Sequence, residues 1–310
     1  FLLKIFASRH PQLQMQSCRR GRVAAPWLRF LLSVLLAVLA LQLVRPSSWS
    51  PAFSAANGAK QGTKMLAEAR GDSEKMLRAY RSLEKMLKDD PENVPLKLSM
   101  AEAVVSYMRI IGNANSPSCI FQDGKPGIET QDTPANMELW AEWAPVAQSL
   151  LKETEAALGS SVFNGKASNY ILSVEAGMYA TSSRGIVSAV LSGKAVSFLA
   201  SVATLEKKYP TFDSHVYCTY WGAYYLAAPW PVRDAGKARS YFERAVKEAP
   251  ASRRNQYFAG LGAFVEGDFA TARGYMKQAL EEPCSSPGEQ DCCTFYTEQA
   301  QRTLSLISDL

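Results

Sequence analysis

Few residues of this chain could perform chemistry, and after the first 56 residues the sequence contains a single histidine, His215. Cys218 follows three positions later, so the two side chains could share one helix face, as a base and a nucleophile would. Such a histidine more commonly packs against or caps the start of its helix. One histidine cannot form a histidine-based metal cluster, and the sequence contains no HExxH, GxSxG or glycine-rich phosphate loop. We therefore expect a protein that is not an enzyme and uses no metal or cofactor.

A stronger candidate for function is a predicted helix over 213–227, which carries the aromatic residues Tyr217, Tyr220, Trp221, Tyr224 and Tyr225. These rings exceed what one helix face can bury against a single neighbour, and all except Tyr225 recur at intervals of three or four residues. They could pack in the core with their polar atoms at its rim. Alternatively, one aromatic face lines a groove for a small apolar ligand or a peptide. We place the candidate ligand or partner groove on this helix.

The cysteines near the end of the chain suggest a disulfide. Cys284, Cys292 and Cys293 share a predicted loop with Pro287 and Gly288. In an oxidising compartment, we expect Cys284 to pair with either Cys292 or Cys293, because adjacent cysteines rarely pair with each other. The spacing and the lack of histidine argue against zinc. Five cysteines follow residue 56, so at least one thiol stays free.

The positive charge of the chain is confined to its beginning. The formal net charge is +5, but residues 1–56 hold seven basic residues and no acidic one. The remainder has 27 basic against 29 acidic residues, which gives no reason to expect a nucleic-acid partner. Arg253 and Arg254 precede Asn255 at a predicted helix start and could pair with an acidic partner. We favour the interpretation that they are solvated.

The first 56 residues read as a targeting leader. The basic stretch 1–29 is followed by the uncharged, largely apolar segment 30–44, and residues 45–56 end in small residues. An apolar segment of this length is short for a membrane span and fits a signal peptide that is cleaved near Ala56. The alternative is a signal anchor in the secretory pathway, with membrane contact only through 30–44. The acid-poor front end resembles a bipartite plastid presequence directed to the thylakoid lumen.

Beyond the leader, the apolar spacing predicts an all-α chain with a tether at 57–72 and a helical-repeat domain at 73–310. Ser73 is the expected N-cap of the first helix. Pro145 is expected to kink or split the helix in which it lies. Residues 112–135 should form a long loop, and 167–207 two buried helices. The other helices are expected over 73–89, 94–111, 136–158, 213–227, 234–249, 252–266, 268–282 and 293–308.

Residues 234–280 repeat at a period of 34, so that Asp234, Ala238 and Ala245 become Asp268, Ala272 and Ala279. A period of this size is typical of the tetratricopeptide unit, a stacked pair of helices. Ala238, Ala245, Gly260, Ala272 and Ala279 should lie where paired helices approach closely. The domain is therefore expected to be an antiparallel helix-pair bundle.

Residues 213–283 resemble tetratricopeptide repeats and, among these, are similar to the T-component proteins of bacterial TRAP-type transporters. The similarity rests on Gly222, Pro229, Asp234, Ala238, Phe242, Ala245 and Pro250. This resemblance implies a helical bundle with a groove or pore that holds a partner protein. We expect a non-enzymatic interaction or scaffold protein in a plastid compartment. The alternative is an accessory protein that binds a solute or a small apolar ligand.

Overall fold

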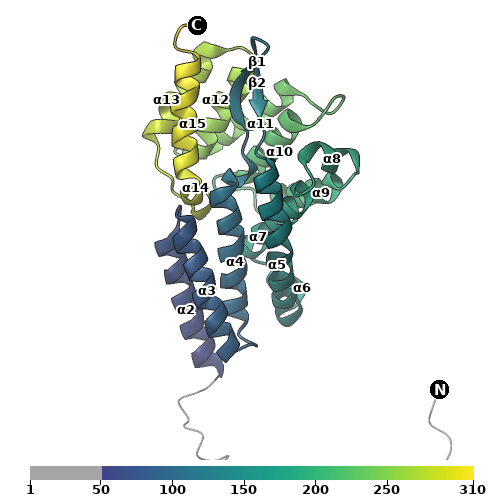
Figure 1. Cartoon of the computed structure of the whole chain (residues 1–310), viewed down its shortest axis with the longest axis vertical. Coiled ribbons are helices and arrows are strands. Elements are labelled where there is room, and N and C mark those ends of the chain that lie inside the picture. The colour runs from purple at the N-terminus through teal and green to yellow at the C-terminus, as the bar shows by residue number, and fades with distance from the viewer. Residues whose placement is uncertain (1–50) are drawn as a thin grey trace, which may run out of the picture. The chain divides into compact units, whose positions relative to one another are not determined.

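The chain is all-α apart from one small hairpin. The computed structural model describes residues 51–310, with side chains from residue 57 onward, and these residues form fourteen α-helices and a two-stranded sheet. The expected fold class is therefore confirmed, and Figure 1 shows helices packed against one another throughout the described part. Residues 1–50, which include the apolar segment 30–44 of the predicted leader, lie outside the described residues.

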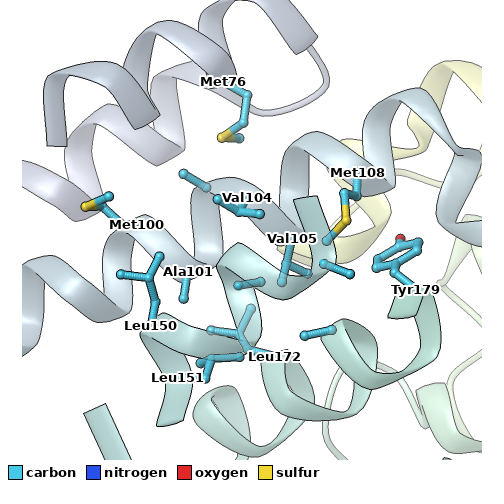
Figure 2. Packing of buried hydrophobic residues seen from close by; sticks show 14 of the residues in the cluster. Met76, Met100, Ala101, Val104, Val105, Met108, Leu150, Leu151, Leu172 and Tyr179 are labelled. Atoms are coloured by element: carbon cyan, nitrogen blue, oxygen red, sulfur yellow. The ribbon is translucent and has the colours of Figure 1, made fainter. Parts of the chain in front are cut away.

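The first half of the described chain packs around one central helix, α4 (Val94–Ile111). Its neighbours are α2 (Pro51–Ala69), α3 (Ser73–Asp89), α5 (Pro134–Leu158) and α7 (Ala167–Ser182). Figure 2 shows Val104 and Met108 of α4 among apolar side chains from the surrounding helices. Both are fully buried, as is Trp140 of α5. This core fixes α4 and α7, which position two charged residues of the site described below.

One local expectation for these helices was wrong. The N-cap of α3 is Asp72 rather than Ser73, because the Asp72 carboxylate accepts a hydrogen bond from the Lys75 backbone N–H at 2.9 Å. An ionised side chain at this position also interacts favourably with the helix dipole. Pro145 does not split its helix, since α5 runs without interruption through it.

The segment 57–72, expected to be a tether, instead lies mostly in α2, whose side chains Leu66 and Ala69 are each 2 % exposed. These apolar residues pack against α3 and α4, so the segment belongs to the helical unit. The predicted cleavage site at Ala56 falls within α2. Among the described residues, no helix combines the length and apolarity needed to cross a membrane.

The period of 34 residues corresponds to equivalent positions in α11 (Ala235–Glu248) and α13 (Phe269–Glu281). Asp234 and Asp268 are the N-caps, and each accepts a hydrogen bond from the backbone N–H three residues later. The equivalent small and apolar side chains have no exposed surface: Ala238 and Ala272, Phe242 and Met276, Ala245 and Ala279. Helix α12 (Arg253–Val265) packs against both α11 and α13. Helix α13 also packs against α15 (Cys293–Leu306).

The expectation of a structureless loop over 112–135 was also wrong. A 3-10 turn at Asn113–Asn115 is followed by β1 (Ser118–Gln122) and β2 (Lys125–Glu129), which pair in antiparallel register. Asp123 and Gly124 connect the strands with positive φ values of 53° and 72°. This is the pairing of conformations that a two-residue Asp-Gly hairpin turn requires. The hairpin packs on α12 and α15.

The remaining helices are short or surround the cavity described next. Residues 167–207 were expected to form two helices, but they form α7, α8 (Ile186–Leu191) and most of α9 (Ala195–Lys208). The extra breaks occur at Gly185 and Gly193, where φ is 86° and 72°. The others are α6 (Ser160–Phe163), α10 (Val216–Ala227) and α14 (Pro287–Asp291).

Candidate ligand cavity

A cavity of about 110 Å³ lies between α7, α8, α9, α10 and α12. Its walls are largely apolar because the facing helices direct aliphatic and aromatic side chains into it: Met178, Ile186, Val190, Phe198, Val216 and Phe258. The same cavity is also lined by four charged residues, Arg109, Glu175, Asp213 and Arg254. A small cavity with apolar walls and a few fixed polar groups is typical of a small-molecule site.

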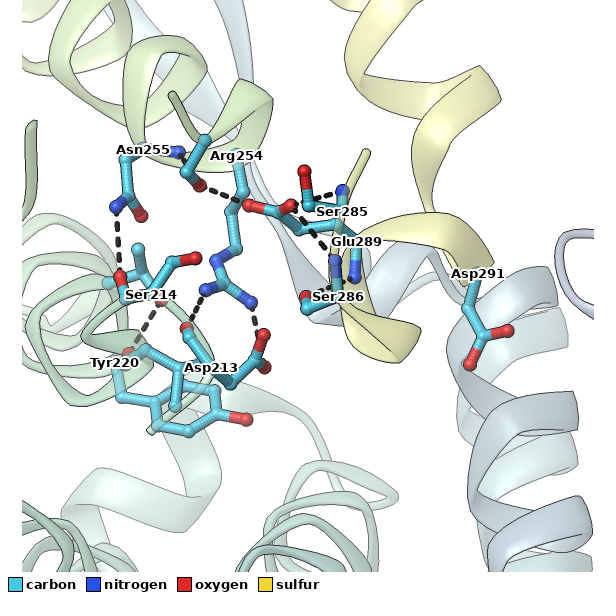
Figure 3. Close-up of polar contacts among 12 residues, drawn as sticks. Asp213, Ser214, Tyr220, Arg254, Asn255, Ser285, Ser286, Glu289 and Asp291 are labelled. Carbon is cyan, nitrogen blue, oxygen red and sulfur yellow. Dashed lines mark hydrogen bonds and ion pairs between the residues drawn. The ribbon is translucent and has the colours of Figure 1, made fainter. Parts of the chain in front are cut away.

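The first charged pair joins Arg254 of α12 to Asp213, which lies just before α10. Arg254 donates from Nη1 to the Asp213 carboxylate at 2.9 Å and from Nη2 to the Asp213 carbonyl oxygen. Figure 3 shows the guanidinium held between these two acceptors. Burial alone would raise the pKa of Asp213, but the opposing charge of Arg254 lowers it below its ordinary value. Both side chains are therefore charged, and they neutralise each other.

The second charged pair joins Arg109 of α4 to Glu175 of α7. Arg109 donates to the Glu175 carboxylate, and to Asp291 of α14 at 2.5 Å. Arg70, which directly follows α2, donates to the same Asp291 oxygen at 3.1 Å, so one carboxylate accepts hydrogen bonds from two guanidinium groups. Burial alone would lower the pKa of Arg109, but Glu175 and Asp291 raise it well above its ordinary value. This network links the cavity to both ends of the described chain.

Tyr220 connects the aromatic helix to this network. Its hydroxyl donates to the second oxygen of Glu175 at 2.8 Å. Burial, and then the negative charge of Glu175, raise the pKa of Tyr220 well above its ordinary value, so the phenol remains protonated. Glu175 therefore accepts hydrogen bonds at both of its oxygens.

Several buried polar atoms of the cavity-lining residues lack a hydrogen-bond partner within the described part of the chain. These include Arg109 Nε, Arg254 Nε and Asn115 Oδ1. Both arginines are less than a tenth exposed, at 6 % and 4 %. Buried polar groups are almost always hydrogen-bonded in folded proteins, and an unpartnered one costs about 1–3 kcal/mol. A bound molecule that both donates and accepts hydrogen bonds would offset this cost.

Two backbone segments beside the cavity adopt an uncommon conformation. Residues 113–115 and 213–215 are each three consecutive non-glycine residues with positive φ, between 47° and 61°. Each such residue costs about 1–2 kcal/mol, and they normally occur singly. The second turn is held from α12, because Arg254 bonds the Asp213 carbonyl and Asn255 donates to the Ser214 carbonyl at 2.9 Å. Conformational strain of this kind concentrates at functional sites.

The structure divides the aromatic residues of α10 among three environments. Tyr220 and Tyr224 line the cavity, whereas Tyr217 is fully buried at 1 % exposure. Trp221 and Tyr225 lie elsewhere on the helix and stack with Tyr241 of α11, with ring centres 6.0 to 6.2 Å apart. Of the aromatic residues that were predicted to form a groove, Tyr220 and Tyr224 thus line the cavity, whereas Trp221 and Tyr225 pack α10 against α11.

The disulfide in the structure joins Cys284 to Cys293, and the free thiols among the residues that the structure describes, Cys119, Cys218 and Cys292, are buried. His215 precedes α10 in a left-handed conformation, and burial lowers its pKa. Among the residues that the structure describes, no group of three or more histidine, cysteine and carboxylate side chains is placed to hold a metal ion.

Arg254 corrects one interpretation of the sequence and illustrates what the sequence did not reveal. It was expected on a solvated helix start, but it is 4 % exposed and paired. Arg109, Glu175 and Asp213 were not identified from the sequence. The signal for Glu175 was a single charged residue within an otherwise uncharged helix, because such a residue rarely lies buried without a partner.

The amino-acid sequence matches no model of a known protein family and no curated protein sequence. The function of this protein is therefore inferred from the geometry of the cavity.

Proposed function

We propose that this protein binds a small, uncharged molecule with an apolar body and a polar end in the cavity beside α10. One observation carries this proposal: apolar walls and buried charged residues line the same small cavity. The apolar walls favour the hydrocarbon part of a ligand, because burial of apolar surface contributes about 25 cal/mol for each Å². The unpartnered Nε and Oδ1 atoms favour a polar end that both donates and accepts hydrogen bonds.

The charges of the lining support an uncharged ligand. Arg109 is opposed by Glu175, and Arg254 by Asp213, so no cavity-lining charge is left for a charged ligand to neutralise. A charged molecule would lose its hydration without gaining a counter-ion, which is costly in a buried site. An alcohol or an amide avoids that cost.

The size of the cavity suggests simple probes. Its volume of about 110 Å³ is somewhat below the roughly 150 Å³ of a cavity that holds benzene. We therefore choose probes no larger than benzene, and we expect calorimetric titration of the purified protein to give the tightest binding for n-butanol, weaker binding for n-butyl chloride and weaker binding still for butyrate. Tightest binding of butyrate would indicate an anion site, and no binding of any probe would refute the proposal.

Tyr224 and Tyr225 provide a matched pair of variants, because they are adjacent half-buried tyrosines of α10 and only Tyr224 lines the cavity. Tyr224→Ala should lower the affinity for n-butanol on the order of tenfold, since it removes part of an apolar wall. Tyr225→Ala should leave the affinity unchanged. Equal effects of both substitutions would move the binding site away from the cavity.

A second candidate function is a scaffold that holds a protein partner, as tetratricopeptide-like stacks do. It is supported by the equivalent packing of α11 and α13, and by Trp230, which is 88 % exposed. We also propose that this scaffold acts in a plastid compartment, which the leader suggests. Affinity purification from the organelle should recover the same partner with wild-type protein and lose it with Trp230→Ala. Imaging of a fluorescent fusion to the leader checks the compartment.

A further inference from the structure

The short helix α8 and the start of α9 have apolar side chains on two opposite faces. On the inner face, Ile186, Ala189 and Phe198 line the cavity. On the outer face, Val187, Leu191 and Val196 are 51 %, 75 % and 66 % exposed. Only a few large apolar side chains of the described residues are this exposed, and three of them are grouped here. We name residues 184–197 the α8–α9 elbow.

The charges of the elbow have one sign. Arg184 and Lys194 are exposed at its two ends, and the sequence contains no acidic residue from 176 to 205. One carboxylate reaches the elbow from outside, because Asp132 accepts a hydrogen bond from the Ile186 backbone N–H at 2.8 Å. In the sequence, Val187 and Leu191 thus lie between the two basic residues, and Val196 follows the second one.

The backbone gives the elbow its form. Gly185 directly precedes α8, and Gly193 lies between α8 and α9. Both have positive φ values. Figure 1 shows α8 and α9 at an edge of the described unit. Side chains at the tip of such a bend can contact an external surface without contact by the rest of the unit.

We propose that the α8–α9 elbow docks on an anionic lipid bilayer. A stable protein interface buries about 800 Å² on each partner, which three side chains cannot supply. Interfacial membrane binding combines apolar side chains at the acyl boundary with basic residues at the headgroups. The elbow has both. This docking does not depend on the cavity being a ligand site, and it is tested separately.

Docking would place the inner face of α8 close to the bilayer. Since Ile186 and Ala189 line the cavity from the same short helix that presents Val187 and Leu191 outward, an apolar ligand could pass between bilayer and cavity. The elbow is therefore a membrane contact separate from the apolar segment 30–44.

The test uses a fluorophore at the elbow so that the leader cannot produce the signal. Leu191→Cys is introduced into the full chain with Cys18→Ser and labelled with a polarity-sensitive dye. The control is Gln301→Cys, an exposed position on α15, in the same background. Each labelled protein is mixed with vesicles of phosphatidylcholine, or of equal parts phosphatidylcholine and phosphatidylglycerol.

We expect a blue shift and an increase in emission only for the label at 191 and chiefly with the anionic vesicles. Adding Arg184→Glu and Lys194→Glu should lower the apparent partition constant at least on the order of tenfold, since each basic residue near the surface contributes to binding. An unchanged emission at 191, an equal response at 301, or no effect of the charge reversals would overturn the proposal. Circular dichroism of each variant verifies that the helices are retained.

Discussion

The ring of Phe242 in α11 lies directly against Gly222 in α10, so that a Cβ at position 222 would come within 2.1 Å of Phe242 Cε1. The same arrangement recurs along the chain, because a Cβ at Gly260 in α12 would lie 2.8 Å from Met276 Cε. Phe242 and Met276 are 34 positions apart. Each repeat therefore inserts its large side chain at a glycine of the preceding helix.

Gly222→Ala should destabilise the protein by about 1–3 kcal/mol, because the buried Phe242 ring has no exposed space into which to move. Chemical denaturation measures this change. The matched control is Gly274→Ala in α13, where an added Cβ meets nothing within 4 Å. The control should be neutral or slightly stabilising, since alanine favours the helix. Equal destabilisation by both substitutions would contradict the close approach at Gly222.

Asp213→Asn should destabilise the protein by about 3–5 kcal/mol at neutral pH, because it removes the carboxylate that pairs with the buried Arg254 guanidinium. Asparagine tolerates the left-handed backbone at this position, so the change isolates the charge. The folded pKa of Asp213 lies below its ordinary value of 3.8. Its contribution is therefore complete above that value and is lost as the pH falls through the lower folded pKa.

Urea denaturation of wild type and Asp213→Asn at neutral and at strongly acidic pH checks this prediction. The difference in the free energy of unfolding between the two proteins should become smaller at acidic pH. Asp72→Asn serves as a surface control, because asparagine also caps helices well and Asp72 lies at the exposed start of α3. If the destabilisation by Asp213→Asn does not vary with pH, the ion pair with Arg254 is not its cause.

Non-reducing peptide mapping should recover a peptide that joins Cys284 to Cys293 and leaves Cys292 free. Cys284→Ser should then lower the stability of the oxidised protein by roughly 2–3 kcal/mol, the entropic value for so short a loop. The same substitution should have little effect under reducing conditions. Three free thiols in protein from its native compartment would contradict both the bridge and an oxidising location.

Sequencing the N-terminus of the native protein should find a start near residue 57 if the leader is cleaved at Ala56. Such a cut would fall within α2 and shorten it by its first six residues. The buried contacts of Leu66 and Ala69 lie beyond the cut and should persist. An intact N-terminal segment would favour the signal anchor.

The helices could be predicted where the spacing of apolar residues agrees with the residues that begin or end a helix. Residues 73–89 have one apolar face and end shortly before Pro91, and the helices over 73–89 and 94–111 have the predicted bounds. The hairpin was missed although Asp123-Gly124 is a strong turn signal, because its strands are short. The cavity could not be predicted, since its charged pairs join residues 66 and 41 positions apart. Such pairings depend on how the helices stack, which no local pattern encodes.

The left-handed turns beside the cavity have a consequence for engineering this protein. Ala114 has φ of 52° but lacks the short polar side chain that makes this conformation tolerable for asparagine or aspartate. A selection for heat resistance should therefore recover glycine at position 114 early, with a gain of about 1 kcal/mol. Because this turn lines the cavity, variants chosen for thermal tolerance alone would tend to lose the rigidity that shapes the site.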